Sequence, residues 1–222
     1  MTTRSERLAA RAARRARAGF TLIELLAVML ILGLLMTFLI PRITEAVDQA
    51  KVTACRKNLL DIYANLMIYD QKFDDIPQKS GVRFFADLVG RKVLEATKST
   101  SKKLTCPGVK ASALEGLRGL PLDEWYKDQE RIDGQFSAYA GRDMDHYPLK
   151  KFPGSGKEPL VADDNDGGEP NHTTTTLVLY ADGSVNAYEQ ALLEEDGTLQ
   201  EDEYLLVGPE SQVEELRKLS LD

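Results

Sequence analysis

The stretch from Gly19 to Ile40 reads GFTLIELLAVMLILGLLMTFLI, and it decides the architecture of the chain. After the glycine, 21 residues contain three polar side chains, those of Thr21, Glu24 and Thr37. As a helix this stretch would extend roughly 31 Å, about the thickness of the hydrocarbon core of a bilayer. The sequence therefore predicts a membrane-spanning helix close to the N-terminus.

The charges on either side of this helix predict its orientation. Residues 1–19 hold six Arg and one Glu, a net charge of +5. Without them the totals of 28 basic and 35 acidic residues fall to 22 and 34, a net charge of −12. Basic residues before the apolar stretch, and few soon after it apart from Arg42, predict an N-terminus in the cytoplasm and a C-terminal domain outside it. The acidic body argues against nucleic acid as the main partner.

Length and composition limit the remaining classes. The chain has 222 residues, of which 43% are hydrophobic and 28% charged. These values are ordinary for globular proteins, so they disfavour collagen-like, fully disordered and polytopic membrane proteins. The length suits one domain of ordinary size or two small ones.

Glu24 distinguishes the apolar stretch from a plain membrane anchor. A carboxylate one turn into an apolar helix is unfavourable unless it has a partner, and such residues are usually functional. A secretory signal peptide does not fit, because the apolar stretch is too long and Gly19 precedes it instead of following it. A plain anchor or uncleaved signal would explain the length and the flanking charge, but not Glu24.

The junction GFTLIELL at residues 19–26 resembles the class III leader junction of type IV pilins and type II secretion pseudopilins. The resemblance implies that a prepilin peptidase cuts between Gly19 and Phe20 and that the new Phe20 amine is methylated. Gly33 and Pro41 match the family's helix-loosening positions, since glycine adds backbone entropy and proline lacks an N–H.

The same resemblance implies a structural subunit and not an enzyme. Glu24 of an incoming subunit is expected to meet the Phe20 amine of its neighbour, and packing of the apolar helices would hold the filament core. The implied partners are copies of this chain or other pilins, the prepilin peptidase and the secretion or pilus assembly machinery. The subunit would move from the inner membrane, where its C-terminal domain is periplasmic, into a type II secretion pseudopilus or a type IV pilus. The alternative is a membrane-tethered binding module that does not polymerise.

An apolar stripe continues beyond Pro41 at spacings of three and four residues, which predicts that the helix continues to about Gln71. Pro77 and Ser80-Gly81 are expected to end it. The predicted stripe consists of Ile43, Val47, Ala50, Ala54, Cys55, Leu59, Ile62, Leu66, Tyr69 and Phe73.

The predicted fold class is α+β and pilin-like, with a long N-terminal helix and a small C-terminal antiparallel sheet. Strands are expected from Leu160, over Thr173–Ala181 and over Ser184–Glu189, with Asp182-Gly183 as a two-residue type I′ hairpin turn. A polar loop is expected at Ser99–Lys103 and a short amphipathic helix at Glu210–Leu219. The expected segments are a cleaved basic leader (1–19), a transmembrane or filament-core helix (20–41), a helix packed on the globular domain (42–76), an irregular insert (77–159), and a β-hairpin region with a C-terminal helix (160–222).

His172 lies ten residues before Asp182-Gly183, a spacing that resembles a bacterial subgroup of prepilin-like proteins with a His-x9-Asp-Gly segment. The Cys55-x-x-Asn-Leu and Cys106-Pro sequences also resemble that subgroup, whereas its usual glycines after the His are threonines here. A single His paired with one Asp is more often a structural hydrogen bond than a metal site, which needs more donors. We therefore expect His172 to tie the start of a strand to the turn.

The two cysteines are expected to form a disulfide, because the predicted compartment is oxidising. A Cys55–Cys106 bond would close a loop of about 50 residues and contribute roughly 3–4 kcal/mol in the chain-entropy model. Its early position favours a pseudopilin over a pilin. Calcium is the one candidate cofactor, with weak candidate ligands in Asp163, Asn165 and Asp166, although their spacing departs from the EF-hand pattern. The sequence indicates no nucleophile pair, metal quartet or phosphate loop for catalysis.

Overall fold

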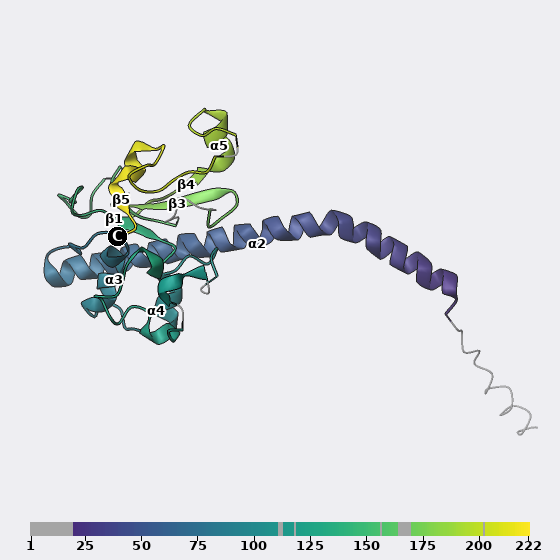
Figure 1. Ribbon diagram of the computed structural model, residues 1–222, viewed down its shortest axis with the longest axis horizontal. Helices are drawn as coiled ribbons and strands as arrows, with labels where there is room; N and C mark the ends of the chain where they lie inside the picture. Colours follow the sequence, from purple (N-terminus) through teal and green to yellow (C-terminus); the bar gives the residue numbers. More distant parts are fainter. Residues whose placement is uncertain (1–19, 111–112, 118, 156, 164–169, 202) are drawn as a thin grey trace, which may run out of the picture. The chain divides into compact units, whose positions relative to one another are not determined.

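The computed structural model describes residues 20–110, 113–117, 119–155, 157–163, 170–201 and 203–222, so the predicted leader lies outside the described residues. The longest element is α2 (Leu22–Phe73), whose N-terminal part is purple in Figure 1. The chain divides into two compact units within this helix, the first ending at Glu45 and the second running from Ala46 to Asp222. The predicted continuous helix is therefore present, two residues longer at its end than expected.

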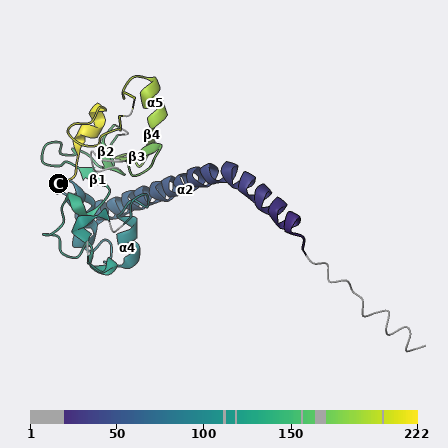
Figure 2. The same cartoon turned by 45° about the vertical axis from the view of Figure 1, so that its right-hand side comes forward.

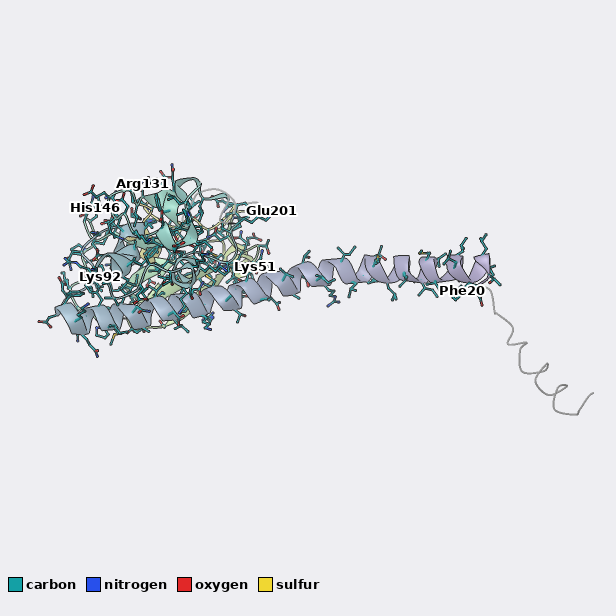
Figure 3. The ribbon with its side chains drawn as sticks, turned by 90° about the horizontal axis from the view of Figure 1, so that it is seen from below. Phe20, Lys51, Lys92, Arg131, His146 and Glu201 are labelled. Carbon is teal, nitrogen blue, oxygen red and sulfur yellow. The ribbon has the colours of Figure 1, made fainter. Side chains whose placement is uncertain are left out.

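The first unit is an apolar helix with uncovered side chains. Every large hydrophobic residue from Leu22 to Ile40 has between 46% and 81% of its surface exposed. Figure 3 shows these side chains projecting around the helix, with Phe20 at its start. The helix runs through Gly33 and Pro41, whose loosening role stays a prediction. An apolar surface on all sides requires lipid or other helices around it.

The second half of α2 supplies one face to the domain core. Its buried residues recur at spacings of three and four, and they are Cys55, Leu59, Ile62, Leu66 and Tyr69. The helix continues through the first part of the predicted stripe, where Ile43, Val47, Ala50 and Ala54 are exposed, and the buried part begins at Cys55.

The long helix ends earlier than its expected breakers. Asp74 takes the left-handed conformation, with φ of 54°, and its N–H donates to the Asp70 carbonyl at 2.7 Å. A left-handed residue after the last turn satisfies a free carbonyl and stops the helix. Pro77 therefore lies beyond the helix end and does not itself cause it.

A five-stranded sheet with neighbours in the order β4-β3-β2-β1-β5 forms the rest of the framework, and every pairing is antiparallel. The strands are β1 (Ala140–Arg142), β2 (Pro159–Ala162), β3 (Thr175–Tyr180), β4 (Val185–Glu189) and β5 (Leu219–Ser220). The α+β prediction is confirmed, although the sequence missed β1 and β5. These strands have only three and two residues, too few to show an alternating pattern.

The sheet separates two apolar clusters. Leu177 and Leu179 of β3 pack with α2 and α3 (Val82–Gly90), whereas Val178 and Tyr180 pack with the C-terminal segment. This alternation follows from the two-residue period of a strand. In Figures 1 and 2, α4 (Lys98–Lys103) lies on the opposite side of the second half of α2 from the strands. Figure 1 shows α3 on that side as well.

The remaining helical elements of the described residues are short. They are η2 (Glu115–Leu117), η3 (Leu122–Glu124), η4 (Gly134–Phe136), α5 (Gln190–Glu195) and η5 (Glu214–Lys218). The polar loop predicted at Ser99–Lys103 is wrong, because Thr97 caps α4 by accepting a hydrogen bond from the Thr100 N–H at 3.2 Å. The predicted C-terminal helix is a 3-10 helix that passes into β5, so only part of Glu210–Leu219 is helical.

The predicted hairpin between β3 and β4 is confirmed, but its turn type is different. Gly183 has a φ of 85°, whereas Asp182 is absent from the described non-glycine residues with positive φ, so the turn is not type I′. The Gly183 N–H donates to Tyr180 O, and the Tyr180 N–H donates to Ser184 O, both at 2.9 Å. This is a three-residue loop with a left-handed glycine at its end.

Candidate functional site

The N-terminal junction forms a reciprocal helix cap. Glu24 Oε2 accepts hydrogen bonds from the Thr21 backbone N–H at 2.9 Å and from Thr21 Oγ1 at 2.8 Å. The Glu24 N–H donates in return to Thr21 Oγ1 at 3.3 Å. This arrangement is a capping box, which satisfies N–H groups that a helix start leaves free. It fixes the carboxylate beside the residue that follows Phe20.

A second group of residues meets in the interior of the domain. The ligand-capable atoms of Cys55, Cys106, Asp163 and His172 all lie within 4.8 Å of one another. We call these residues the four-donor cluster. Each has at most 2% of its surface exposed. The cluster therefore combines two thiols, a carboxylate and an imidazole out of contact with solvent.

Four separate parts of the fold supply this cluster. Cys55 comes from the buried face of α2, and Cys106 follows α4. Asp163 directly follows β2, and His172 precedes β3. Because β2 and β3 are adjacent antiparallel strands, the end of one lies beside the start of the other. The sheet pairing therefore brings Asp163 and His172 together.

Direct contacts join the members of the cluster. The Cys55 thiol donates to Asp163 Oδ2 at 3.4 Å, and Cys106 Sγ lies 3.3 Å from His172 Nε2. His172 Nε2 also lies 3.3 Å from Asp163 Oδ2. Asp163 uses its other oxygen, Oδ1, to accept from the Leu177 N–H at 2.8 Å.

Burial and hydrogen bonding shift the protonation of these groups in opposite directions. Burial raises the pKa of Cys55, and its hydrogen bond to Cys106 adds to that effect. Burial would also raise the pKa of Cys106, but hydrogen bonds from Cys55 and His172 lower it below the ordinary thiol value. Burial lowers the pKa of His172, yet Asp163 and Cys106 raise it to about 10. Cys106 and His172 therefore favour each other's charged forms.

His172 does not make the contact expected from its spacing to Asp182-Gly183. Its ring contacts Cys106 and Asp163, while Asp182 Oδ1 accepts from the Ser184 N–H at 2.9 Å and from Ser184 Oγ at 2.6 Å. His172 therefore does not bond to the turn as expected and is instead a member of the four-donor cluster. Gly183 serves the turn and also lies against the Tyr63 ring.

The expected disulfide is also absent, since Cys55 and Cys106 are both free thiols. The expectation failed because the sequence could not show that a carboxylate and an imidazole reach the same place. Of the weak calcium candidates, Asn165 and Asp166 lie outside the described residues, whereas Asp163 faces the interior. Calcium binding stays a prediction.

The sequence did contain a partial signal for the cluster. The resemblance that drew attention to His172 also singled out Cys55 and Cys106-Pro107, and these three residues meet in space. Asp163 was missed in this role because the sequence pattern singled it out only as a weak calcium ligand. Its position directly after a β-strand and nine residues before His172 was the available clue.

Comparison with known proteins agrees with the fold and the N-terminal junction, which define a pilin-like subunit. Residues 14–40 match the prokaryotic N-terminal methylation motif. The chain is also 34% identical over 113 residues to type II secretion system core protein G of Pseudomonas aeruginosa, covering 50% of this chain and 70% of that protein. The chain belongs to the family of type II secretion pseudopilins, which are subunits of the pseudopilus. No solved structure matches it.

Family membership indicates the role of the apolar part of α2. A stretch of this helix is long and apolar enough to cross a membrane, and none of it is buried. In a pseudopilin, this helix anchors the subunit in the membrane.

Proposed function

We propose that this chain is made as a precursor, cut between Gly19 and Phe20, methylated at the Phe20 amine and polymerised into a type II secretion pseudopilus. The observation that carries the proposal is the capping box at the junction. It holds the Glu24 carboxylate at the start of an uncovered apolar helix, close to where the new amine would arise.

Charge pairing would select the register of assembly. An amine and a carboxylate are both unfavourable in hydrocarbon unless each has an opposite charge beside it. Both bonds from Thr21 reach Glu24 Oε2, so Oε1 is the oxygen proposed to receive the ammonium of a neighbouring Phe20. A misplaced subunit would leave both charges unpaired, which favours one position along the filament.

The rest of the helix would form the filament core. Its exposed apolar side chains are suited to lipid before assembly and to neighbouring helices after it. The basic segment before Gly19 supports an N-terminus in the cytoplasm and a periplasmic domain. The proposed partners are copies of this chain, other pilins, the prepilin peptidase and the assembly machinery, and the proposed role is structural without catalysis.

Processing and assembly have separate tests. Mass spectrometry of the mature protein should give an N-terminal methyl-Phe20, and a chain that starts at Met1 would refute processing. For assembly, Glu24→Gln should be processed but should lose sheared filaments and secretion. Glu45→Gln is the matched control, because Glu45 is another exposed carboxylate on α2. Normal filaments from Glu24→Gln would refute charge pairing, whereas a wild-type chain that is processed but forms no filaments would support the tethered module.

A further inference from the structure

We propose that the four-donor cluster is a structural zinc site, with ligands Cys55 Sγ, Cys106 Sγ, Asp163 Oδ2 and His172 Nε2. Zinc favours four-coordinate sites made from thiolate, imidazole and carboxylate ligands. The chain supplies one donor atom from each of four side chains, all within 4.8 Å of one another. The inference is independent of whether the subunit polymerises.

Three separations between the donors match those of a tetrahedron around zinc. Zinc with ligand bonds of about 2.0–2.3 Å holds its ligand atoms roughly 3.3–3.8 Å apart. The sulfur of Cys55 lies 3.4 Å from Asp163 Oδ2, and the sulfur of Cys106 lies 3.3 Å from His172 Nε2. Asp163 Oδ2 and His172 Nε2 are 3.3 Å apart. A disulfide would account for the two sulfurs but not for the convergence of the other two donors.

Groups around the cluster orient its ligands as in a metal site. A metal-bound histidine commonly directs its second ring nitrogen at a carboxylate. His172 Nδ1 is buried without a hydrogen bond and lies 3.7 Å from Asp48 Oδ1. Asp48 is itself held in place, because Thr173 Oγ1 donates to Asp48 Oδ2 at 2.9 Å. This pair would fix the ring and leave Nε2 for the ion.

Asp163 and Cys106 are positioned in a comparable way. The Leu177 N–H occupies Asp163 Oδ1, which leaves Oδ2 to face the cluster. The Gly108 N–H donates to Cys106 Sγ at 3.3 Å, a contact that favours the thiolate. Gly108 has no space for a side chain, because an added Cβ would collide with the Asn171 carbonyl next to His172.

Burial indicates a structural ion and not a catalytic one. A catalytic zinc keeps an open position for water or substrate, whereas a structural zinc has four protein ligands. All four side chains are buried, so the site is closed. A bound ion would also neutralise charge that is unfavourable in the interior. It would join α2, the segment after α4 and two neighbouring strands, replacing the disulfide as the link between distant segments.

The test uses the full chain, purified in detergent without chelators. Elemental analysis should find about one zinc ion per chain. Removing the zinc and adding cobalt(II) should give the intense visible bands of tetrahedral cobalt and a thiolate-to-metal charge-transfer band. A folded chain without stoichiometric zinc and without these bands would overturn the proposal. So would a metal-free chain lighter by two hydrogens than the reduced form, since that mass identifies a disulfide.

Variants then assign the ligands. His172→Ala and Cys106→Ser should each lower the zinc content below about a tenth of an ion per chain and weaken thermal stability. His146→Ala is the matched control, because the side chain of His146 is 79% exposed and lies outside the cluster. Full zinc content in a folded His172→Ala protein would refute the assignment. If that variant does not fold, the cobalt spectrum of the wild-type chain decides.

Discussion

Glu24 and Thr21 hold each other through three hydrogen bonds at the start of α2. The proposed assembly carboxylate is therefore oriented within its own chain before any neighbour arrives. We predict that Thr21→Val reduces filament yield, because it keeps the shape of the side chain but removes the hydroxyl that orients Glu24. The measurement is the amount of sheared filament relative to total mature subunit.

Thr21→Ser provides the matched control for this variant, since serine retains the hydroxyl. The mature forms of the wild-type, Thr21→Val and Thr21→Ser chains should accumulate to equal levels. Only Thr21→Val should lose filaments. Equal filament yields for valine and serine would mean that the cap contributes nothing to assembly.

Gly183 is expected to resist substitution for two separable reasons. Its φ of 85° disfavours any side chain, at a cost of about 1–2 kcal/mol, and an added Cβ would lie 2.7 Å from Tyr63 Cε1. Gly197 has a similar φ of 79° but no atom within 4 Å of an added Cβ. Gly183→Ala should therefore lower the free energy of unfolding by more than Gly197→Ala, as measured by urea denaturation. Equal losses would show that the Tyr63 contact relaxes freely.

The elements that the sequence predicted well are those with long or distinctive local patterns. Residues 22–73 contain enough apolar spacing to predict one helix, and Asp182-Gly183 between two β-prone runs predicts a hairpin. Both are local properties of the chain. The short strand β1 is different, because Ala140-Gly141-Arg142 has no β pattern. It pairs with β2 and β5 through contacts that only the folded chain creates.

The four-donor cluster could not be predicted for the same reason, because it depends on contacts that only the folded chain creates. Cys55 and His172 are separated by more than a hundred residues. Taken alone, each fits an ordinary structural role, a disulfide for Cys55 and a hydrogen bond for His172. Their meeting depends on α2 packing against the sheet and on Asp163 ending β2 beside the start of β3. No local spacing encodes that convergence. Glu24 could be singled out from the sequence because Thr21, its capping partner, and the proposed cleavage position lie within five residues of it.

The ion pairs of Glu158 stabilise the domain, and this stabilisation should be lost in acid. It lies 2.7 Å from Arg142 Nη2 and 3.1 Å from Lys218 Nζ. Burial would raise its pKa, but Lys218 and Arg142 lower it below its ordinary value of 4.5. A carboxyl with a lowered folded-state pKa contributes stability above its unfolded pKa and loses it as the pH falls through the folded one.

We therefore predict that Glu158→Gln lowers the free energy of unfolding at pH 7 by about 1–3 kcal/mol, because it leaves the buried Arg142 without its carboxylate. The difference from wild type should shrink below about pH 4.5, where Glu158 begins to be protonated in the unfolded chain. Urea denaturation at several pH values measures this difference, and the other titrating groups cancel. Glu130→Gln, at an exposed carboxylate, should show no such trend. A constant difference down to pH 3 would contradict the assigned role.

Asp48 offers a test of the zinc proposal that leaves all four ligands intact. It faces His172 Nδ1 at 3.7 Å and would orient the ring without touching the ion. Removing such a partner typically weakens metal affinity by about 10–100-fold. We predict a loss of that size for Asp48→Asn, measured by competition with a chromophoric chelator, while the zinc content at saturation stays unchanged.

Glu45→Gln again supplies the control, because Glu45 lies three residues earlier on α2 and is exposed. A purely structural role for Asp48 would change the stability of zinc-loaded and zinc-free protein equally. A positioning role would instead lower the stability gained on adding zinc, because that gain depends on affinity. Unchanged affinity in Asp48→Asn would mean that His172 is oriented by the packing around it, and that Asp48 has no part in the site.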